Sequence, residues 1–241
     1  MSPMSESASD QELESIYLGD ERPRPWLLVN MVSSVDGGTE VAGRSSVIGD
    51  AQDSVVFKSL RAVSDLILVA AATARAETYG PARLPDRLVR WRQDRGMAPN
   101  PRIAIVSRSL DFDMDAFEDS PPIVVTSEGS PPERREGLAE RTDVVVAGGE
   151  RADMTDALHR LRELGHDRIL CEGGPSLNGQ LAVEDLVDEW CLTISPLLLS
   201  GDSKRIVSGP GLDGGHRVVL DRVLRGRKSI FTRWLRANSN G

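Results

Sequence analysis

Short apolar runs recur along the chain and are separated by longer polar or amphipathic segments. Each run has four to seven residues bounded by turn residues or charges, as is typical of strands buried on both faces of a sheet. The runs cover residues 26–32, 66–70, 103–106, 123–126, 143–147 and 168–171. The pattern therefore predicts six central strands, and the first of them ends at an Asp-Gly-Gly turn.

Helical spacing appears between these runs. Residues 50–63 begin with Asp50, a good helix cap, and their apolar residues recur at every third or fourth position. The same pattern predicts a helix over 153–164, which Gly165 is placed to end, and a shorter helix over 175–183. A strand followed by a helix and another strand implies parallel pairing, so we expect a mainly parallel sheet.

The C-terminal third has a different pattern, which makes the sheet mixed. Residues 189–199 read as a long strand, and 216–225 and 228–236 are expected to pair as an antiparallel hairpin across Arg225-Gly-Arg227. The predicted fold class is therefore α/β, with a mixed central sheet, flanking helices and a C-terminal hairpin.

Two segments lack a clear strand or core-helix pattern. Residues 1–24 are polar and acidic and predict a flexible tail with one short helix near 12–17, which leaves 25–238 as a single domain. Residues 80–100 contain several prolines and arginines and predict a long connection near the surface or a site. Its arginines are expected to form either a solvated face or a lid.

Composition narrows the class of protein. The chain has 241 residues and a formal net charge of −8, which argues against nucleic-acid binding through a basic face. No run of 18 apolar residues and no signal-like start is present, so no membrane contact is expected and a cytoplasmic protein is predicted. The two cysteines, Cys171 and Cys191, lie in apolar strand-like runs, and neither a metal site nor a disulfide is expected.

The segment Ile169-Leu-Cys-Glu-Gly-Gly-Pro-Ser-Leu-Asn-Gly179 is the most informative candidate site. A buried strand leads into Gly173 and Gly174, and a helix follows with Pro175 at its first position. Glycines let a phosphate approach the main chain, and the free N–H groups of a helix start attract its charge. The segment therefore predicts a pyrophosphate site, or else an ordinary strand-to-helix turn.

Three further strand ends carry candidate groups, each with two interpretations. Thr73 follows small residues that either leave room for a cofactor or allow close packing. Asp36 either orients or protonates a substrate, or holds its own turn. Ser107 and Arg108 form either a clamp for a phosphate monoester or a common strand-end pair.

Taken in order, these motifs resemble one family, the reductase domain of the bacterial riboflavin-biosynthesis deaminase/reductase. The resemblance covers residues 26–236 and rests on four segments. They are Ser34-Val-Asp-Gly37, Leu60-Arg-Ala62 followed by Ala70 to Thr73, Glu172 to Leu177, and the Leu-Val-Asp-Glu strand that begins at Leu186 and ends in Pro196.

The resemblance implies a dihydrofolate-reductase-like, three-layer α/β/α fold that binds NADPH and forms a homodimer. The implied partner is a phosphorylated small-molecule substrate. The implied cofactor contacts are Thr73, Glu77, Ser107, Arg108, Gly173, Gly174, Pro175, Ser176, Leu177 and Asn178. The implied substrate contacts are Ser45, Arg61, Arg83 and Glu172, with the two arginines serving a ribose 5-phosphate. Asp36 and Glu172 are assigned orienting and proton-handling roles.

The chain also departs from the family pattern. Val47 replaces a usual Trp, Gly38 replaces a frequent basic residue, and Thr78-Tyr-Gly80 replaces Asp-Asp-Pro, which leaves the match of Arg83 uncertain by about a residue. No zinc-deaminase motif precedes the reductase segment, so deamination is expected elsewhere, or the substrate differs.

Three hypotheses follow. The first is NADPH-dependent reduction of 5-amino-6-(5-phosphoribosylamino)uracil to its ribitylamino product. The second keeps the cofactor and changes the substrate to a dihydrofolate-like pterin or another heterocycle. The third is a non-catalytic nucleotide-binding paralogue, which predicts no NADPH oxidation with any substrate.

Overall fold

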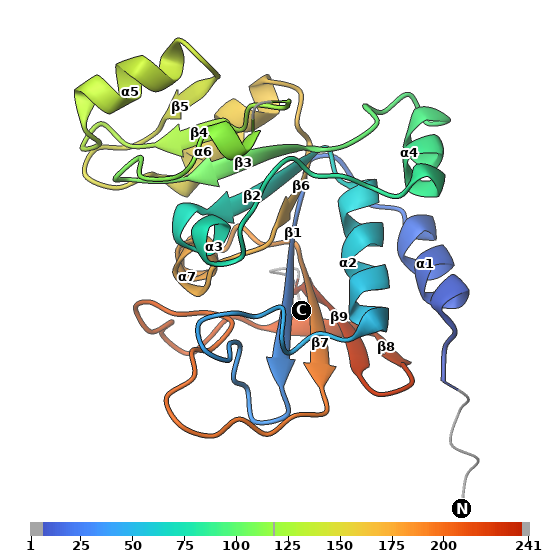
Figure 1. Cartoon of the computed structure of the whole chain (residues 1–241). Coiled ribbons are helices and arrows are strands. Elements are labelled where there is room, and N and C mark those ends of the chain that lie inside the picture. Colours follow the sequence, from blue (N-terminus) through green and yellow to red (C-terminus); the bar gives the residue numbers. More distant parts are fainter. Residues whose placement is uncertain (1–6, 118, 238–241) are drawn as a thin grey trace, which may run out of the picture.

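The computed structural model describes residues 7–117 and 119–237, and this part of the chain folds around one nine-stranded sheet (Figure 1). The strands are β1 Trp26–Ser34, β2 Leu66–Ala70, β3 Arg102–Val106, β4 Ile123–Thr126, β5 Val144–Val146, β6 Arg168–Cys171, β7 Glu189–Ser195, β8 Val218–Arg225 and β9 Ile230–Arg236. Their order is β5-β4-β3-β2-β6-β1-β7-β9-β8. The pairs from β5 to β7 are parallel, and β9 pairs antiparallel with both β7 and β8, so the predicted mixed sheet is confirmed.

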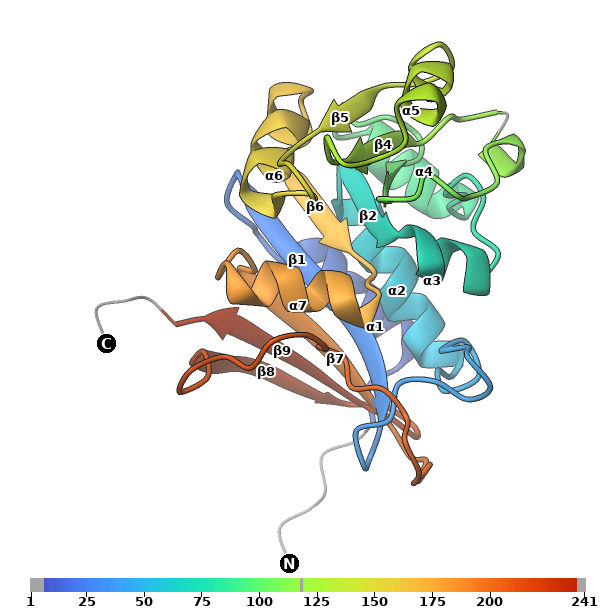
Figure 2. The ribbon, with the colours of Figure 1, turned by 90° about the vertical axis from the view of Figure 1, so that its left-hand side faces the viewer.

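Helices cover both faces of the sheet, as Figure 2 shows for α6 and α7 on one side and α1 and α2 on the other. The helices are α1 Asp10–Gly19, α2 Ala51–Val63, α3 Ala71–Ala76, α4 Asp86–Gln93, α5 Pro132–Ala139, α6 Met154–Glu163 and α7 Pro175–Val183. On β1, Leu27 and Val29 pack toward α6 and α7, whereas Leu28 packs toward α1 and α2. Alternate side chains of this strand are thus buried on opposite faces, which explains its continuous apolar run and confirms the three layers.

Residues 7–24 differ from the expected flexible tail. Ser9 caps α1 in a reciprocal pair with Glu12, and Leu13 and Tyr17 are buried against the core. Arg22 then forms a buried ion pair with Glu189 of β7, with Nε 2.9 Å from Oε2. The short helix predicted near residues 12–17 is present as α1, and two apolar residues one helical turn apart are enough to dock it, although the segment is polar on average. Residues 1–6 lie outside the described part, as does residue 238 of the predicted domain.

The connection over residues 80–100 is also more ordered than its composition indicates. It contains α4, whose Arg92 is 2% exposed and donates hydrogen bonds to the carbonyl oxygens of Ala62, Ser64 and Ala98. Carbonyls at a helix end need such donors, so Arg92 ties α4 to the C-terminal end of α2. Residues 86–93 are thus a packed helix. Four of the five arginines of the segment, Arg83, Arg87, Arg90 and Arg95, are exposed, as a solvated face expects, and a lid role stays a prediction.

Two smaller differences concern the end of one strand and one additional helix. The strand expected over 189–199 ends at Ser195, because Pro196 has no N–H to continue the ladder. The helix α5 was not predicted, since none of its residues is buried and it has no apolar face to produce a periodic signal. No helix in the described part of the chain is long and apolar enough to cross a membrane.

Candidate active site

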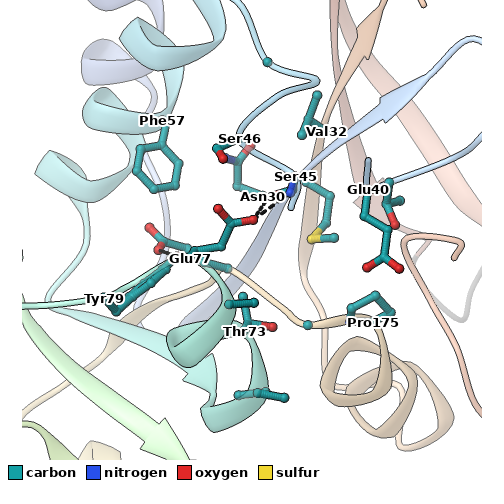
Figure 3. A pocket seen from close by; sticks show the side chains of 18 of the residues that line it. Asn30, Val32, Glu40, Ser45, Ser46, Phe57, Thr73, Glu77, Tyr79 and Pro175 are labelled. Carbon is teal, nitrogen blue, oxygen red and sulfur yellow. Dashed lines mark hydrogen bonds between the residues drawn. The ribbon is translucent and has the colours of Figure 1, made fainter. Parts of the chain in front are cut away.

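A cavity of about 680 Å³ opens at the carboxyl ends of β1, β2 and β6 (Figure 3). These strands are adjacent and parallel, and β6 enters the sheet between the two strands formed earlier in the chain. Ligands of open α/β sheets bind where the connections leave adjacent strand ends in different directions. The walls come from α2, from the turn into α3, from the start of α7 and from the loop after β1.

Glu172, at the end of β6, is held by two side chains of the cavity wall. Arg61 of α2 donates Nε to Oε1 and Nη2 to Oε2, both at 2.7 Å, and the Tyr79 hydroxyl donates to Oε2 at 2.6 Å. Burial alone would lower the pKa of Arg61, but the Glu172 charge raises it above the ordinary value. Burial and then the same charge raise the pKa of Tyr79 well above its usual value, so the phenol stays a donor. The guanidinium of Arg61 is thus engaged by Glu172.

The start of α7 faces the same cavity and has free backbone donors. Gly174 is the N-cap, and no side chain of the described residues caps this helix end. The N–H groups of Ser176 and Leu177, in the first turn, have no intrahelical acceptor. Both residues line the cavity, as does Thr73, whose Oγ1 lies 2.5 Å from where a Cβ on Gly174 would be. Glycine is therefore required for this close approach.

Glu77, at the end of α3, holds the loop that follows β1 over the cavity. Its Oε1 accepts hydrogen bonds from the Ser45 backbone N–H at 2.6 Å and from the Ser45 hydroxyl at 2.9 Å, shown as dashed lines in Figure 3. Partial burial would raise the pKa of Glu77, but the hydrogen bonds from Ser45 and Ser46 lower it. One predicted cofactor contact is thus bonded to one predicted substrate contact.

Asp36 does not line this cavity, and its catalytic role stays a prediction. Its carboxylate accepts hydrogen bonds from the Ser34 hydroxyl and from the N–H groups of Leu199 and Ser200. The Ser34 bond and then the two backbone bonds lower the pKa of Asp36 to about 2. The side chain holds the β1 turn against the loop after β7, beside a second cavity of about 320 Å³. The structure therefore shows the contacts that the turn interpretation of Asp36 expects.

Other predicted contacts also lie away from the cavity lining. Arg83 is exposed and pairs with Asp119, with Nη2 2.7 Å from Oδ2. Arg108 is exposed and pairs with Glu150 at 3.3 Å, and the neighbouring Ser107 hydroxyl accepts the N–H of Leu110. These three residues are not brought to the cavity because the strands and loops that carry them end outside its walls.

Two residues of the Gly-Gly-Pro segment support the turn from behind. Asn178 is fully buried, and its amide donates to the Ile206 carbonyl at 2.8 Å. The carbonyl of Gly173 accepts the N–H of Ala70 at 2.7 Å, which joins the ends of β6 and β2. They position the first turn of α7 and are not themselves part of the cavity lining.

Several residues that line the cavity were not predicted from the sequence. Among them are Tyr79, Phe57, Asp53 and Asn30. Asn30 left a visible signal, because it is a polar residue in the middle of the first apolar run, on the same strand face as Leu28. Its side chain is 8% exposed, and its Oδ1 has no hydrogen-bond partner within the described part of the chain. The other three have no feature in the sequence that distinguishes them from ordinary helix or loop residues.

The cavity is rich in acceptors. Of the described residues that line it, five are carboxylates and two are cations. The carboxylates are Glu40, Asp50, Asp53, Glu77 and Glu172. The cations, Arg61 and Lys204, are paired with Glu172 and Glu40. In the described residues no group of three or more His, Cys, Asp or Glu side chains is arranged to hold a metal ion.

Known proteins are similar to this chain in fold and in sequence. A pyrimidine reductase-like protein from Corynebacterium diphtheriae superposes with a TM-score of 0.84 at 26% identity, over 94% of this chain and 99% of that one. The 2,5-diamino-6-ribosylamino-4(3H)-pyrimidinone 5′-phosphate reductase of Methanothermobacter thermautotrophicus is 33% identical over 195 residues, which are 79% of this chain and 87% of that protein. The reductase of the same name from Aquifex aeolicus is 28% identical over 222 residues, 88% of this chain and 96% of that protein.

The nine-stranded mixed sheet and its cavity define a reductase with a dihydrofolate-reductase-like fold. More particularly, the chain belongs to the family of the RibD C-terminal domain, whose profile matches residues 25–230. The family predicted from the motifs is confirmed, and the protein is an oxidoreductase of the pyrimidine reductase type.

Proposed function

We propose that this reductase uses NADPH to convert the ribosylamino group of a 6-(5-phosphoribosylamino)pyrimidine into a ribitylamino group. The observation that carries the proposal is the common cavity of Glu172 and the uncapped start of α7, in a chain that belongs to a reductase family. Relatives that align over most of their length with this chain are named for the 2,5-diaminopyrimidinone substrate. The uracil substrate predicted from the sequence differs from it by one deamination.

The residues present fit a dinucleotide. The free N–H groups of Ser176 and Leu177 and the positive end of the α7 dipole suit a pyrophosphate. Gly174, which has no side chain, lets the Thr73 hydroxyl come close to the main chain beside these N–H groups. A volume of about 680 Å³ lies within the range of cofactor sites.

When bound, NADPH supplies the hydride that adds to C1′ of the sugar. The C1′–O4′ bond breaks, and O4′ takes up a proton, so one proton is consumed for each NADPH. Glu172, fixed by Arg61 and Tyr79, orients the sugar by accepting hydrogen bonds from its hydroxyl groups. Arg61 acts through Glu172, and Ser45 remains a proposed substrate contact at the loop.

The preference for NADPH over NADH is proposed to come from Arg108, with Ser107 beside it. Arg108 is exposed at the end of β3, and its pairing with Glu150 at 3.3 Å is easily replaced by a 2′-phosphate. Arg108→Ala is expected to raise KM for NADPH about tenfold and to leave KM for NADH unchanged. An equal effect on both cofactors would contradict this placement.

The predicted homodimer is proposed to form through the edge of the sheet. Val218, Val219, Leu220 and Val223 of β8 are each 43–55% exposed, and this strand is the outer one of the described sheet. An exposed apolar edge strand is a template for pairing with another chain. Sedimentation of the wild type and of Val219→Lys tests this, and a monomeric wild type would exclude it. A cytoplasmic location stays a prediction.

The first experiment follows NADPH absorbance while the diaminopyrimidinone, the uracil compound and dihydrofolate are offered separately. Turnover with either ribosylaminopyrimidine supports the proposal. Turnover with dihydrofolate alone identifies a different substrate class, and no turnover with any of the three favours the non-catalytic paralogue.

A further inference from the structure

Lys204 and Glu40 form an ion pair at the wall of the cavity. Lys204 Nζ lies 3.1 Å from Glu40 Oε2, and both residues line the cavity. They come from segments far apart in the sequence, Glu40 from the loop after β1 and Lys204 from the loop after β7. The Lys204 side chain is 59% exposed and that of Glu40 is 28% exposed. A solvent-exposed pair of this kind contributes little to stability, so its partners are easily exchanged.

The main chain of Lys204 is anchored, while most of its side chain is in solvent. The Lys204 carbonyl oxygen accepts hydrogen bonds from the Thr39 hydroxyl at 2.9 Å and from the Thr39 N–H at 3.1 Å. The neighbouring Ser203 packs against Gly38, where its Oγ lies 2.9 Å from the position that a Cβ would take. Lys204 thus extends a flexible four-carbon stem from a fixed position.

The loop that carries Lys204 is also anchored to the first turn of α7. The Asn178 amide donates to the Ile206 carbonyl at 2.8 Å. Ile206 is two residues from Lys204, so their Cα atoms lie at most about 7 Å apart. In Figure 3 the Glu40 side chain points toward Pro175, the first residue of α7. The ion pair therefore lies beside the helix start that is proposed to bind a pyrophosphate.

A phosphate group that enters the cavity needs a positive charge that can leave its present partner. Among the described residues that line the cavity, the cations are Arg61 and Lys204. Arg61 is held by Glu172 through two hydrogen bonds of 2.7 Å, and its departure would leave a buried carboxylate without a counter-charge. Lys204 leaves only Glu40, whose carboxylate water is able to hydrate in its place. Lys204 is therefore the lining cation that is available to a phosphate.

We propose that Lys204 exchanges Glu40 for a phosphate group of the bound ligand, so that Glu40 acts as an internal competitor for that phosphate. The inference rests on the proposed function, because the pyrophosphate of NADPH is the group that the start of α7 would place near Lys204. A phosphate there also accepts from the free N–H groups of Ser176 and Leu177, which favours the exchange. The 5′-phosphate of the sugar has the same chemistry, and binding of ADP and of ribose 5-phosphate distinguishes the two sources.

Substitutions at both positions test the exchange by calorimetry. Lys204→Gln removes the charge and should raise the Kd for ADP about tenfold. Glu40→Gln keeps the size of the side chain and releases Lys204, so the Kd for ADP should fall about threefold. Lys228→Gln removes the same charge from an exposed residue between β8 and β9, outside the cavity lining, and is the matched control. Its Kd should stay within about twofold of the wild type.

The double variant Lys204→Gln/Glu40→Gln separates exchange from general repulsion. If Glu40 competes by occupying Lys204, the gain from Glu40→Gln should largely disappear when Lys204 is already replaced. An equal gain in both backgrounds would show that Glu40 only repels the anion, and it would overturn the inference.

The two probes identify the source of the phosphate without turnover. A weaker Kd for ADP in Lys204→Gln assigns the contact to the cofactor pyrophosphate, and a weaker Kd for ribose 5-phosphate assigns it to the substrate. Either result supports the inference even if no ribosylaminopyrimidine is reduced. In steady-state kinetics, Lys204→Gln should raise KM for the reactant concerned and leave kcat unchanged.

Three further results would overturn the inference. One is an unchanged Kd for both probes in Lys204→Gln, which would leave the proposed function intact if a ribosylaminopyrimidine is still reduced. Another is a wild type that binds neither ADP nor ribose 5-phosphate. The third is a loss of affinity in Lys228→Gln equal to that in Lys204→Gln, because the net charge of the protein would then explain both.

Discussion

Glu172 and Arg61 meet in a two-pronged ion pair, with both N–O distances 2.7 Å and side chains only 2% and 15% exposed. The planar guanidinium also lies 4.2 Å from the centroid of the Phe57 ring, which shields it from water. This pair fixes the position of the Glu172 carboxylate in the cavity. It also neutralises the charge of Arg61, which was predicted from the sequence to bind the ribose 5-phosphate.

Removal of one partner should therefore affect stability as well as activity. Arg61→Ala leaves the Glu172 carboxylate buried without a counter-charge, and we expect a loss of about 3–5 kcal/mol in the free energy of unfolding. Urea denaturation measures it. The double variant Arg61→Ala/Glu172→Gln should recover part of this loss, because no buried charge remains. If Arg61→Ala and the double variant unfold at the same urea concentration as the wild type, the ion pair does not contribute to the free energy of unfolding.

Tyr79 is expected to act as a positioning residue for Glu172. Tyr79→Phe removes the 2.6 Å hydrogen bond to Oε2 and keeps the ring, so kcat should fall about tenfold while the Kd for NADPH stays unchanged. Steady-state kinetics with both reactants varied resolves the two effects. Tyr17→Phe, at a buried tyrosine of α1 outside the cavity, is the control. A rise in KM alone, without a change in kcat, would show that the hydroxyl contacts the substrate and not Glu172.

Gly174 should tolerate no side chain while Thr73 is present. A methyl group there would meet the Thr73 Oγ1, so Thr73 or the first turn of α7 would have to shift. Gly174→Ala is expected to weaken NADPH binding at least about tenfold, as measured by fluorescence titration. The double variant Gly174→Ala/Thr73→Ser should recover little, because Oγ remains. Affinity for NADPH equal to the wild type in Gly174→Ala would place the pyrophosphate elsewhere.

Asp36 should contribute to stability in acid. Its folded pKa is about 2, lowered from 3.8 by the Ser34 hydroxyl and two backbone N–H groups. A lowered folded pKa stabilises the protein above the unfolded pKa, and this contribution is lost as the pH falls from about 4 toward 2. The free energy of unfolding should decrease more steeply over that window in the wild type than in Asp36→Asn. Parallel curves for the two proteins would mean that the carboxylate has no special role in the turn.

Local patterns in the sequence were sufficient for most elements. The strands β1, β2 and β6 are apolar runs because both faces of the sheet are buried. The start of α2 is marked by a residue that caps the free N–H groups of the helix end. Both signals lie within a few neighbouring residues of the sequence. The helix α1 was underestimated, since its docking depends on Leu13 and Tyr17 meeting α2 and the sheet. Average polarity does not report such a contact.

The sequence by itself determined the family, the order of the strands along the chain, and the strand-to-helix turn at Gly173 and Gly174, because these depend on residues close together in the chain. Only the tertiary structure decided which side chains meet in the cavity. Glu172 contacts Arg61 and Tyr79, which are 111 and 93 positions away, and among the described residues the Oδ1 of Asn30 finds no hydrogen-bond partner. Asp36 and Arg83 lie outside the cavity lining for the same reason. Hydrogen bonds and ion pairs act over a few ångströms, and tertiary packing sets those distances.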